Sequence, residues 1–410
     1  MTAAVLGLRA NARQFGLLVV VNAFVGAMVG IERSVLPVLA EEEFGIASAT
    51  AVLSFVAVFG LTKAAANLAA GTLADRFGRR RLLILGWLVA LPVAPMIIWA
   101  PSWGWVVAAN AFLGVNQGLA WSMTVVMKID LAGPERRGLA MGLNEASGYV
   151  AVAVLAWATA ALASAHGPET APFVLGLAIA VAGLALSVAF VRDTADHVHA
   201  EVGPATTRAR PPREVFRAAT TGDPTLSAAS QAGLVTNLND GLAWGLVPIF
   251  LAGEGLTIGR IGVVAALYPA VWGLGQLLTG AWSDHIGRKP LIVAGMSTQA
   301  AGIALLVAWQ AYPGWLAAAV LMGAGTALTY PTLIAVVADR AGPVDRAAAV
   351  GVYRWWRDLG FVAGALVAGA VADVVGMEAA ILMVAAVTGA SGVVVAVRMS
   401  ESVSVPAWGT

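Results

Sequence analysis

The chain has 410 residues, 59% of them hydrophobic and only 11% charged, with a formal net charge of +1. Soluble domains usually carry about 25% charged residues, so most of this surface is not expected to face water. The absence of cysteine from the sequence excludes disulfides, thiolate catalysis and cysteine-ligated zinc or iron–sulfur sites.

Apolar stretches long enough to cross a membrane recur along the whole chain. A transmembrane helix needs about 20 predominantly apolar residues, and a backbone in lipid must satisfy its own hydrogen bonds. The first stretch follows Arg9 and Arg13 and continues to Ala40, too long for the apolar part of a signal peptide, so we expect it to be retained. We predict twelve helices, over residues 15–40, 49–72, 82–100, 103–127, 138–164, 171–191, 226–252, 259–282, 290–311, 314–338, 346–374 and 378–397.

The basic residues predict the orientation of these helices. Nineteen of the 24 lysine and arginine residues lie at the two termini or in connections that follow an even-numbered helix, and four lie inside the spans. Arg260 alone lies in a connection on the other side. Because basic residues collect on the cytoplasmic side, we expect a multi-pass protein of the plasma (inner) membrane with both termini in the cytoplasm.

A polar stretch over residues 193–225 separates two groups of six predicted helices. It holds four prolines and four arginines, which is typical of a linker. We therefore predict a first six-helix bundle over 1–192, a cytoplasmic linker over 193–225 and a second bundle over 226–410. Clustered acidic and histidine side chains in such a loop are usually solvated, so we expect no metal at Asp193, Asp196, His197, His199 and Glu201.

An internal repeat relates the two groups. Residues 71–81 read GTLADRFGRRR and residues 280–290 read GAWSDHIGRKP, with four identities at an offset of 209 positions. Residues 130–142, DLAGPERRGLAMG, and 339–351, DRAGPVDRAAAVG, have seven identities at the same offset. Two motifs that share one offset indicate a duplication, and six helices per half make the repeats parallel.

The loop motif after the second and the eighth predicted helix resembles the best-known motif of the major facilitator superfamily. The resemblance covers essentially the whole chain and implies an all-α fold of twelve transmembrane helices in two pseudo-symmetric bundles. It also implies that the motif holds the two halves together on the cytoplasmic side. The motif residues are Gly71, Asp75, Gly78 and Arg79 in the first half and Gly280, Asp284, Gly287 and Arg288 in the second.

Eight charged residues lie well inside the predicted spans. A charge at a helix centre costs about 2.5–3.5 kcal/mol on insertion scales, so these residues must face the interior, form pairs or line water. They fall in predicted helices 1, 2, 5, 7 and 11, and helices 3, 6, 9 and 12 carry none. The resemblance implies the same division, because those four helices stand outside the central cavity in the family.

Polar and aromatic residues also form stripes at helical spacing, as ligand pockets do. The alternative is structural: Glu32 with Arg33, and Arg357 with Asp358, would then only pair and hold helices together. We predict that the substrate cavity is lined by Arg33, Lys63, Asn67, Gln117, Trp121, Asn237, Trp244, Tyr268, Trp272, Gln276, Arg354 and Arg357.

The energy source is expected to be a gradient. The phosphate-binding pattern G-x-x-x-x-G-K-[ST] is absent, and no histidine lies in a span, so neither an ATPase nor another enzyme is expected, and no cofactor. A carboxyl group can be neutral when desolvated and ionised when paired or wet, which allows proton coupling. The candidate proton carriers are Asp240, Glu32, Glu145 and Asp358, with Asp240 favoured because it lies near midspan.

We therefore expect a monomeric secondary transporter of a small organic solute or drug-like compound, embedded in the lipid bilayer, with no nucleic-acid partner. Export is favoured over uptake. Two departures weaken a simple multidrug–proton antiporter assignment: predicted helix 5 lacks the proline of the family's export motif, and Gly114 stands where an arginine is frequent. The alternatives are a proton-coupled uptake permease for an organic anion or metabolite and a non-transporting membrane sensor of the same fold.

Overall fold

The computed structural model describes residues 6–132, 137–194, 196–197 and 210–401, and within these ranges the regular secondary structure is entirely helical. The first half contains α1 (Ala12–Arg33), α2 (Leu36–Glu42), α3 (Ala49–Phe77), α4 (Arg79–Ala90), α5 (Val93–Ile98), α6 (Trp103–Asn116), the π-helical η1 (Gln117–Trp121), α7 (Ser122–Ala132), α8 (Arg137–His166) and α9 (Ala171–Ala189). The second half contains α11 (Pro212–Arg217), η3 (Ala218–Gly222), α12 (Pro224–Gly241), η4 (Leu242–Leu246), α13 (Val247–Gly253), α14 (Ile258–Ile286), α15 (Arg288–Ala308), α16 (Tyr312–Val374) and α17 (Met377–Arg398).

Ten helical stretches in the described residues are long and apolar enough to cross a membrane. The two other predicted spans, 103–127 and 346–374, are also helical, but they are more polar. Asn110, Asn116 and Gln117 lower the hydropathy of the first, and the second carries three charges around Arg357. The predicted all-α membrane fold is therefore confirmed, and both of the least apolar spans carry candidate site residues.

Prolines account for breaks inside two predicted spans. Helix α1 ends at Arg33 and α2 begins at Leu36, with Pro37 in the first turn of α2. Pro92 separates α4 from α5 in the same way. Proline has no N–H to donate, so it suits the start of a new helix, although neighbouring helices can support it in an interior, as at Pro269 in α14.

The segment 339–345, which the sequence predicts as a loop, is helical in the structure. It joins two predicted spans into α16, which has 63 residues. A straight helix would place Tyr330 and Arg357 about 40 Å apart, at about 1.5 Å per residue. Instead, Arg357 donates a hydrogen bond to the hydroxyl of Tyr330. The chain therefore reverses direction within α16.

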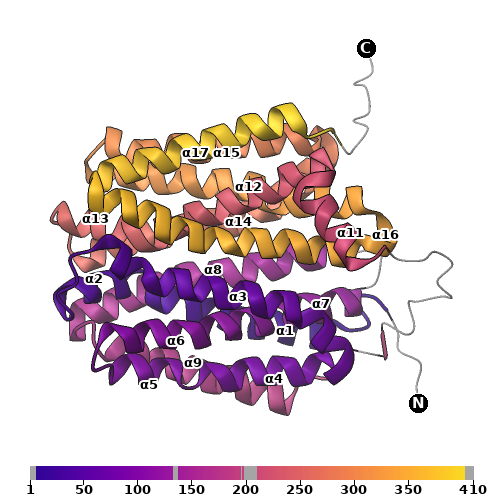
Figure 1. The fold of residues 1–410 in the computed structure, drawn as a ribbon. Helices are drawn as coiled ribbons and strands as arrows, with labels where there is room; N and C mark the ends of the chain where they lie inside the picture. Colours follow the sequence, from indigo (N-terminus) through magenta and orange to yellow (C-terminus); the bar gives the residue numbers. More distant parts are fainter. Residues whose placement is uncertain (1–5, 133–136, 195, 198–209, 402–410) are drawn as a thin grey trace.

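The two halves meet along two helix pairs (Figure 1). Helix α3 packs on α16, and α8 packs on α14; we call these contacts the α3–α16 seam and the α8–α14 seam. Small residues allow the close approach. A Cβ on Gly60 of α3 would lie 2.5 Å from the Cβ of Phe361, and one on Gly262 of α14 would lie 2.1 Å from the Cβ of Ala160.

The motif glycines form the turns at one end of the bundle. Gly78 lies between α3 and α4 with φ of +85°, and Gly287 lies between α14 and α15 with φ of +100°. We call this the motif end. The opposite end, where residues 34–48, 253–257 and 375–376 lie, is the far end.

Acidic residues that follow the last helix of each half cap a helix at the motif end. Asp193 accepts a hydrogen bond from the backbone N–H of Arg80 at 2.9 Å, in the first turn of α4. Glu401 accepts from the N–H groups of Arg288 and Lys289, at 2.9 and 3.1 Å, in the first turn of α15. A carboxylate at a helix N-terminus accepts hydrogen bonds from free N–H groups and interacts favourably with the positive end of the helix dipole. Asp193, one of the clustered linker acids, is thus a helix cap.

The two repeated motifs contact each other in both halves. Arg79 pairs with Asp130 at 3.0 Å, and Arg288 pairs with Asp339 at 3.3 Å. Each pair joins the loop motif to the second motif, 51 positions later. The side-chain positions at Gly71, Asp75, Gly280 and Asp284 lie outside the part of the chain whose side chains the structure describes.

We expect Gly78→Ala and Gly287→Ala each to lower the free energy of unfolding by about 1–2 kcal/mol, because an alanine in the left-handed region is strained. At position 78 the new Cβ would also lie 2.9 Å from Oδ2 of Asp193. Gly142→Ala is the control: Gly142 lies in α8 with nothing within 4 Å of the place that a Cβ would take, so no loss is expected. Unfolding of the purified variants in detergent measures the difference, and equal stability of all three would contradict the assignment.

Candidate functional site

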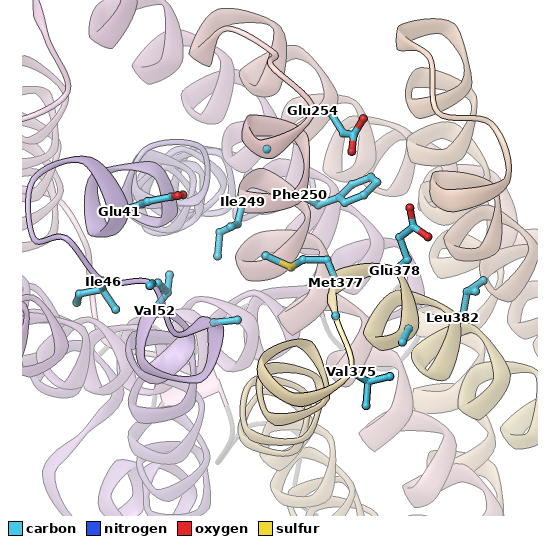
Figure 2. Close-up of a pocket in the computed structure, with 15 residues that line it drawn as sticks. Glu41, Ile46, Val52, Ile249, Phe250, Glu254, Val375, Met377, Glu378 and Leu382 are labelled. Carbon is cyan, nitrogen blue, oxygen red and sulfur yellow. The ribbon is translucent and has the colours of Figure 1, made fainter.

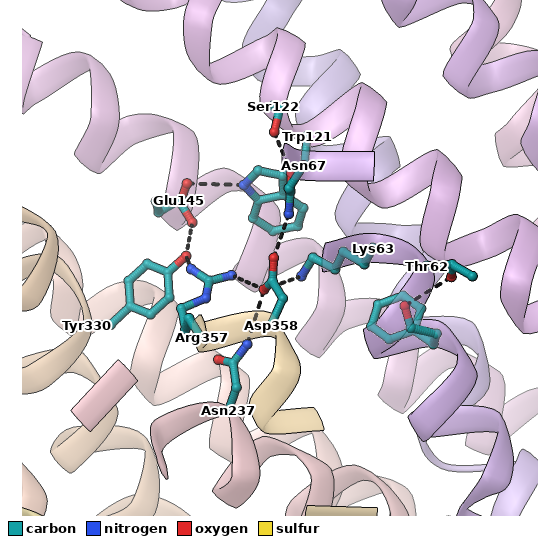
Figure 3. A network of polar contacts seen from close by, with 11 residues as sticks. Thr62, Lys63, Asn67, Trp121, Ser122, Glu145, Asn237, Tyr330, Arg357 and Asp358 are labelled. Carbon is teal, nitrogen blue, oxygen red and sulfur yellow. Dashed lines mark hydrogen bonds and ion pairs between the residues drawn. The ribbon is translucent and has the colours of Figure 1, made fainter. Parts of the chain in front are cut away.

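A buried carboxylate at the middle of the α3–α16 seam joins the two halves (Figure 3). Asp358 is completely buried and accepts from Asn67 at 2.5 Å, from Arg357 at 3.0 Å and from Asn237 at 3.2 Å. The ammonium of Lys63 lies 3.8 Å from the same carboxylate. Lys63 and Asn67 belong to the first half, and Arg357 and Asn237 belong to the second. The four donors neutralise and orient one anion, and separation of the halves at this level would remove two of them.

A second carboxylate extends this network to α8. Glu145 accepts from the indole N–H of Trp121 at 3.1 Å and from the hydroxyl of Tyr330 at 3.2 Å. Tyr330 in turn accepts from the guanidinium of Arg357, which also binds Asp358. One arginine therefore connects both carboxylates, and the connection crosses between the halves at Tyr330. We call Lys63, Asn67, Trp121, Glu145, Asn237, Tyr330, Arg357 and Asp358 the central network.

A small cavity of about 10 Å³ adjoins the central network. This volume is about that of one water probe, so the centre is nearly closed in this state. Arg354 lines the cavity and interacts electrostatically with Asp358 and Tyr330 without a hydrogen bond to either of them. Tyr149 and Tyr330 supply aromatic surface. Cationic and aromatic side chains around a cavity are typical of ligand sites.

Asp240 lies in the second half beside the aromatic residues of α14. Its Oδ1 accepts from the hydroxyl of Tyr268, while its Oδ2 is buried without a partner among the described residues. One helical turn beyond Tyr268, Trp272 stacks on Tyr149 of α8 with 3.5 Å between ring centroids. Gln276 follows, with a buried amide nitrogen that has no described partner. Asp240 thus forms no ion pair with any described residue, unlike Asp358.

Glu32 and Arg33 lie at the end of α1 on the far side of the central network. The guanidinium carbon of Arg33 is 4.8 Å from the ring centroids of both Phe59 and Trp244, so it contacts aromatic faces from both halves. The Arg33 guanidinium forms no ion pair with the Glu32 carboxylate in the described chain, although the charge of Arg33 and the amide of Asn110 both lie near that carboxylate. The predicted alternative, a simple Glu32–Arg33 pair, is thus not what the geometry shows.

Gln117 lies apart from the seam. It donates to the carbonyl of Val25 at 2.8 Å, inside the first half. Trp121, four residues later, does reach the central network, and both residues belong to η1. Trp244 belongs to the π-helical η4. Single π-helical turns are frequently found at functional sites, because they redirect side chains that a regular helix would place elsewhere.

Three buried residues in or near this site were not singled out from the sequence. Tyr330 stands 209 positions after Trp121, so the repeat offset could have found it. Tyr149 is one turn after Glu145, which helical spacing could have found. Lys128 lies just beyond a predicted span, yet it is completely buried in α7 and donates to the carbonyl of Leu18 at 3.2 Å. No local pattern distinguishes that lysine from a solvated one.

The described linker residues from Arg210 onward are anchored to the second half. The guanidinium Nε of Arg210 lies 2.6 Å from Oδ2 of Asp345, and its backbone N–H donates to Oδ1 at 2.9 Å. These two hydrogen bonds, first the backbone and then the side-chain one, hold the pKa of Asp345 below its ordinary value. Of the clustered linker acids and histidines, His199 and Glu201 lie outside the described residues.

A larger cavity opens at the far end, away from all the predicted site residues (Figure 2). Its volume is about 730 Å³. Figure 2 shows Glu41 on one side and Glu254 and Glu378 on the other, with apolar side chains such as Phe250 and Met377 between them. Both halves contribute to its wall, so its shape depends on how they meet.

Comparison with known proteins gives one family and two partial relatives. Residues 18–229 and 229–408 each match the family model of the Major Facilitator Superfamily. A stretch of 92 residues is 40% identical to the multidrug efflux pump LfrA of Mycolicibacterium smegmatis, and covers 22% of this chain and 18% of that protein. A stretch of 118 residues is 35% identical to the multidrug resistance protein MdtH of Yersinia enterocolitica, and covers 27% of this chain and 29% of that protein.

The chain therefore matches less than a third of the length of either relative. The family match, in contrast, extends over almost the whole sequence as two consecutive units, which agrees with the 209-residue repeat. The expected family and fold are confirmed, and so is the expectation of a transporter rather than an enzyme. The protein is a multi-pass membrane transporter that belongs to the Major Facilitator Superfamily.

Proposed function

We propose that this protein exports small organic compounds across the plasma membrane by alternating access, driven by protons that enter through its buried carboxyl groups. The observation that carries the proposal is the central network, in which Asp358 is held by side chains from both halves. An exchange between two states requires contacts that one state makes and the other breaks. Asn67 and Lys63 are such contacts, because they lie across the seam from Asp358.

Proton coupling is proposed from the positions of the carboxyl groups. A carboxyl group tends to bind a proton when water and cations are withdrawn from it and to release it when they return. Asp358 depends on donors from the opposite half, and Glu145 depends on Tyr330. Movement of the halves therefore changes the surroundings of both groups. Asp240, with one oxygen unpartnered, is the proposed principal carrier.

Export and membrane orientation rest on two further arguments. The partial relatives are named for multidrug efflux and multidrug resistance, and the aromatic residues around the small cavity suit compounds with an apolar body. The positive-inside rule assigns the motif end to the cytoplasm, since most basic residues lie on that side. We further propose that the two six-helix halves, joined by residues 193–225, act in one monomeric chain.

The competing proposal is uptake of an organic anion, and Arg354 is the observation that favours it. Together with Lys63 and Arg357, Arg354 gives the small cavity three cationic side chains. Lys63 and Arg357 already form ion pairs with Asp358, whereas Arg354 forms no ion pair with any of the described residues. An anionic substrate would form an ion pair with Arg354.

Ligand-induced stabilisation of the purified protein separates the two proposals. A ligand at about 100 times its Kd raises the free energy of unfolding by about 2.7 kcal/mol. If organic acids stabilise the protein, we expect Arg354→Ala to remove that effect, because the unpaired guanidinium is lost. Arg260→Ala is the control, since Arg260 is exposed and packs over Tyr312 at the far end. Stabilisation by organic cations that survives Arg354→Ala supports export of drug-like compounds, whereas stabilisation only by acids contradicts it.

The transport test uses proteoliposomes with an imposed pH gradient and a compound selected by that binding screen. We expect saturable flux that depends on the gradient and that shows counterflow of labelled substrate. Saturable flux without any response to the pH gradient would contradict proton coupling. Binding without flux or counterflow would instead support a sensor of the same fold.

A further inference from the structure

A carboxylate of the second half binds the first half at the far end of the α3–α16 seam. Asp373, in the last turn of α16, accepts from the hydroxyl of Ser48 at 2.8 Å. It also accepts from the backbone N–H of Ala49 at 2.6 Å and of Thr50 at 3.1 Å. Ser48 is the N-cap of α3, and Ala49 and Thr50 form its first turn. A residue of the second half thus caps a helix of the first half.

Such a contact is strong and easily reversible. The first N–H groups of a helix have no partner within the helix, and the helix dipole favours a negative charge there. Hydrogen bonds to an ionised acceptor are roughly twice as strong as neutral ones. On separation of the halves, water can replace every partner, because Asp373 and Ser48 are already largely exposed.

The backbones approach closely at the same point. A Cβ on Gly369, one turn before Asp373, would lie 2.8 Å from the Cα of Thr50. Deeper in the bundle, Trp244 stacks on Phe361 with 5.6 Å between ring centroids, and Arg33 contacts Trp244. These layers lie between the far end and the central network, so the Asp373 contact is the outermost closure of this seam.

The α8–α14 seam lacks a corresponding carboxylate. The repeat offset of 209 relates Asp373 to Ser164 and Ser48 to Thr257, the N-cap of α14. Ser164 does lie beside the first turn of α14, since its hydroxyl oxygen is 3.2 Å from where a Cβ on Gly259 would be. However, that hydroxyl donates to the carbonyl of Ala160 in its own helix at 2.9 Å. The two seams therefore close the far end by different chemistry.

We propose that Asp373 is a latch that holds the far end shut, and that its release from the first turn of α3 is required before the central layer opens to that side. Among the described residues, the α8–α14 seam has Ser164 in place of this latch. The latch sets the balance between states rather than the affinity for substrate, because it lies at the surface, away from the central network. The far-end cavity shares Ala49 with the latch, so this cavity changes when the latch releases.

A cysteine reporter tests the latch without any substrate. The chain has no native cysteine, so Val56→Cys is a unique label site. Val56 is completely buried in α3 and lies 3.7 Å from where a Cβ on Gly245 of η4 would be, across the interface. In nanodiscs, a maleimide reaches position 56 only when the far end opens. We expect Asp373→Asn to raise the labelling rate about tenfold, since hydrogen bonds to a charged group contribute about 1.5–3 kcal/mol.

Glu378→Gln is the matched control. Glu378 is a carboxylate at the same end, but it accepts from Gln310 within the second half at 2.6 Å, so labelling at position 56 is expected to stay at the parent rate. Ser164→Asp adds a carboxylate beside the first turn of α14 and is expected to slow labelling. Equal labelling of the Asp373→Asn and Glu378→Gln proteins would overturn the proposal.

Two further variants serve if Asp373→Asn does not fold, as judged by its unfolding transition. Ser48→Ala removes one donor to the latch and is expected to raise labelling, while Ser164→Asp keeps Asp373 in place. No acceleration by Ser48→Ala together with no slowing by Ser164→Asp would also overturn the latch. Since labelling needs neither substrate nor protons, this outcome is independent of the proposed transport function.

Discussion

Asp358→Ala is expected to lower the free energy of unfolding by about 3–5 kcal/mol, as breaking a buried ion pair from one side does. Asp358 is the completely buried anion between Lys63 and Arg357. Its removal leaves both cations without their carboxylate and leaves the amides of Asn67 and Asn237 without an acceptor. Transport is expected to be lost in parallel, because the contact that joins the halves is gone. Unfolding in detergent and flux in proteoliposomes measure the two effects.

A charge-balanced double variant distinguishes electrostatics from packing. Lys63→Met combined with Asp358→Asn removes one cation together with the anion, so we expect it to recover part of the lost stability. Arg210→Ala is the control for an exposed pair: Arg210 is about half exposed at its side chain, and such pairs contribute about 0–1 kcal/mol. A loss below about 1 kcal/mol for Asp358→Ala would contradict the role assigned to this carboxylate.

Asp240→Asn is expected to abolish accumulation driven by the pH gradient while substrate counterflow persists. Asparagine keeps the shape and the hydrogen bond with Tyr268 but cannot take up and release a proton. Coupling between two ligands is typically worth about 1–3 kcal/mol. The ratio of gradient-driven transport to counterflow should therefore decrease by a factor of about 5 to 150 in the variant. Parallel flux assays with and without the gradient provide this ratio.

The control for Asp240→Asn is another carboxylate outside the centre. Asp345→Asn loses its interaction with Arg210 at the motif end, and gradient-driven transport is expected to remain. Glu145→Gln, alone and combined with Asp240→Asn, shows whether the second carboxylate shares the role. Undiminished accumulation by the combined variant would exclude both groups as proton carriers.

Periodicity and the repeat predict much of this molecule. Apolar runs locate the helices, and the common offset relates Trp121 to Tyr330, which meet at the central network. Breaks at Pro37 and Pro92 divide two of the predicted spans into two helices each. The helical 339–345 segment escapes prediction, because a polar stretch between two spans has the composition of a loop.

The partners within the site escape prediction for a different reason. Asn67 and Asp358 are 291 positions apart, and helical spacing only identifies which face of each helix is polar. Helix packing between the halves decides whether Lys63 and Arg357 form ion pairs with Asp240 or with Asp358, and local sequence does not encode that packing. Lys128 shows the same limit, since its burial between helices follows from the tertiary arrangement alone.

The helix caps and arginine–aspartate pairs at the motif end occur in both halves, but the central layer is different in each. By the repeat offset of 209, Glu145 of the first half corresponds to Arg354 of the second, and Lys63 corresponds to Trp272. After the ancestral gene duplication, both halves thus kept the contacts at the motif end, while the residues of the central layer diverged. Two identical linings would offer an asymmetric molecule two equivalent binding poses, related by rotation about the membrane normal. The unlike linings of this protein distinguish those poses, so a bound compound should adopt a single orientation.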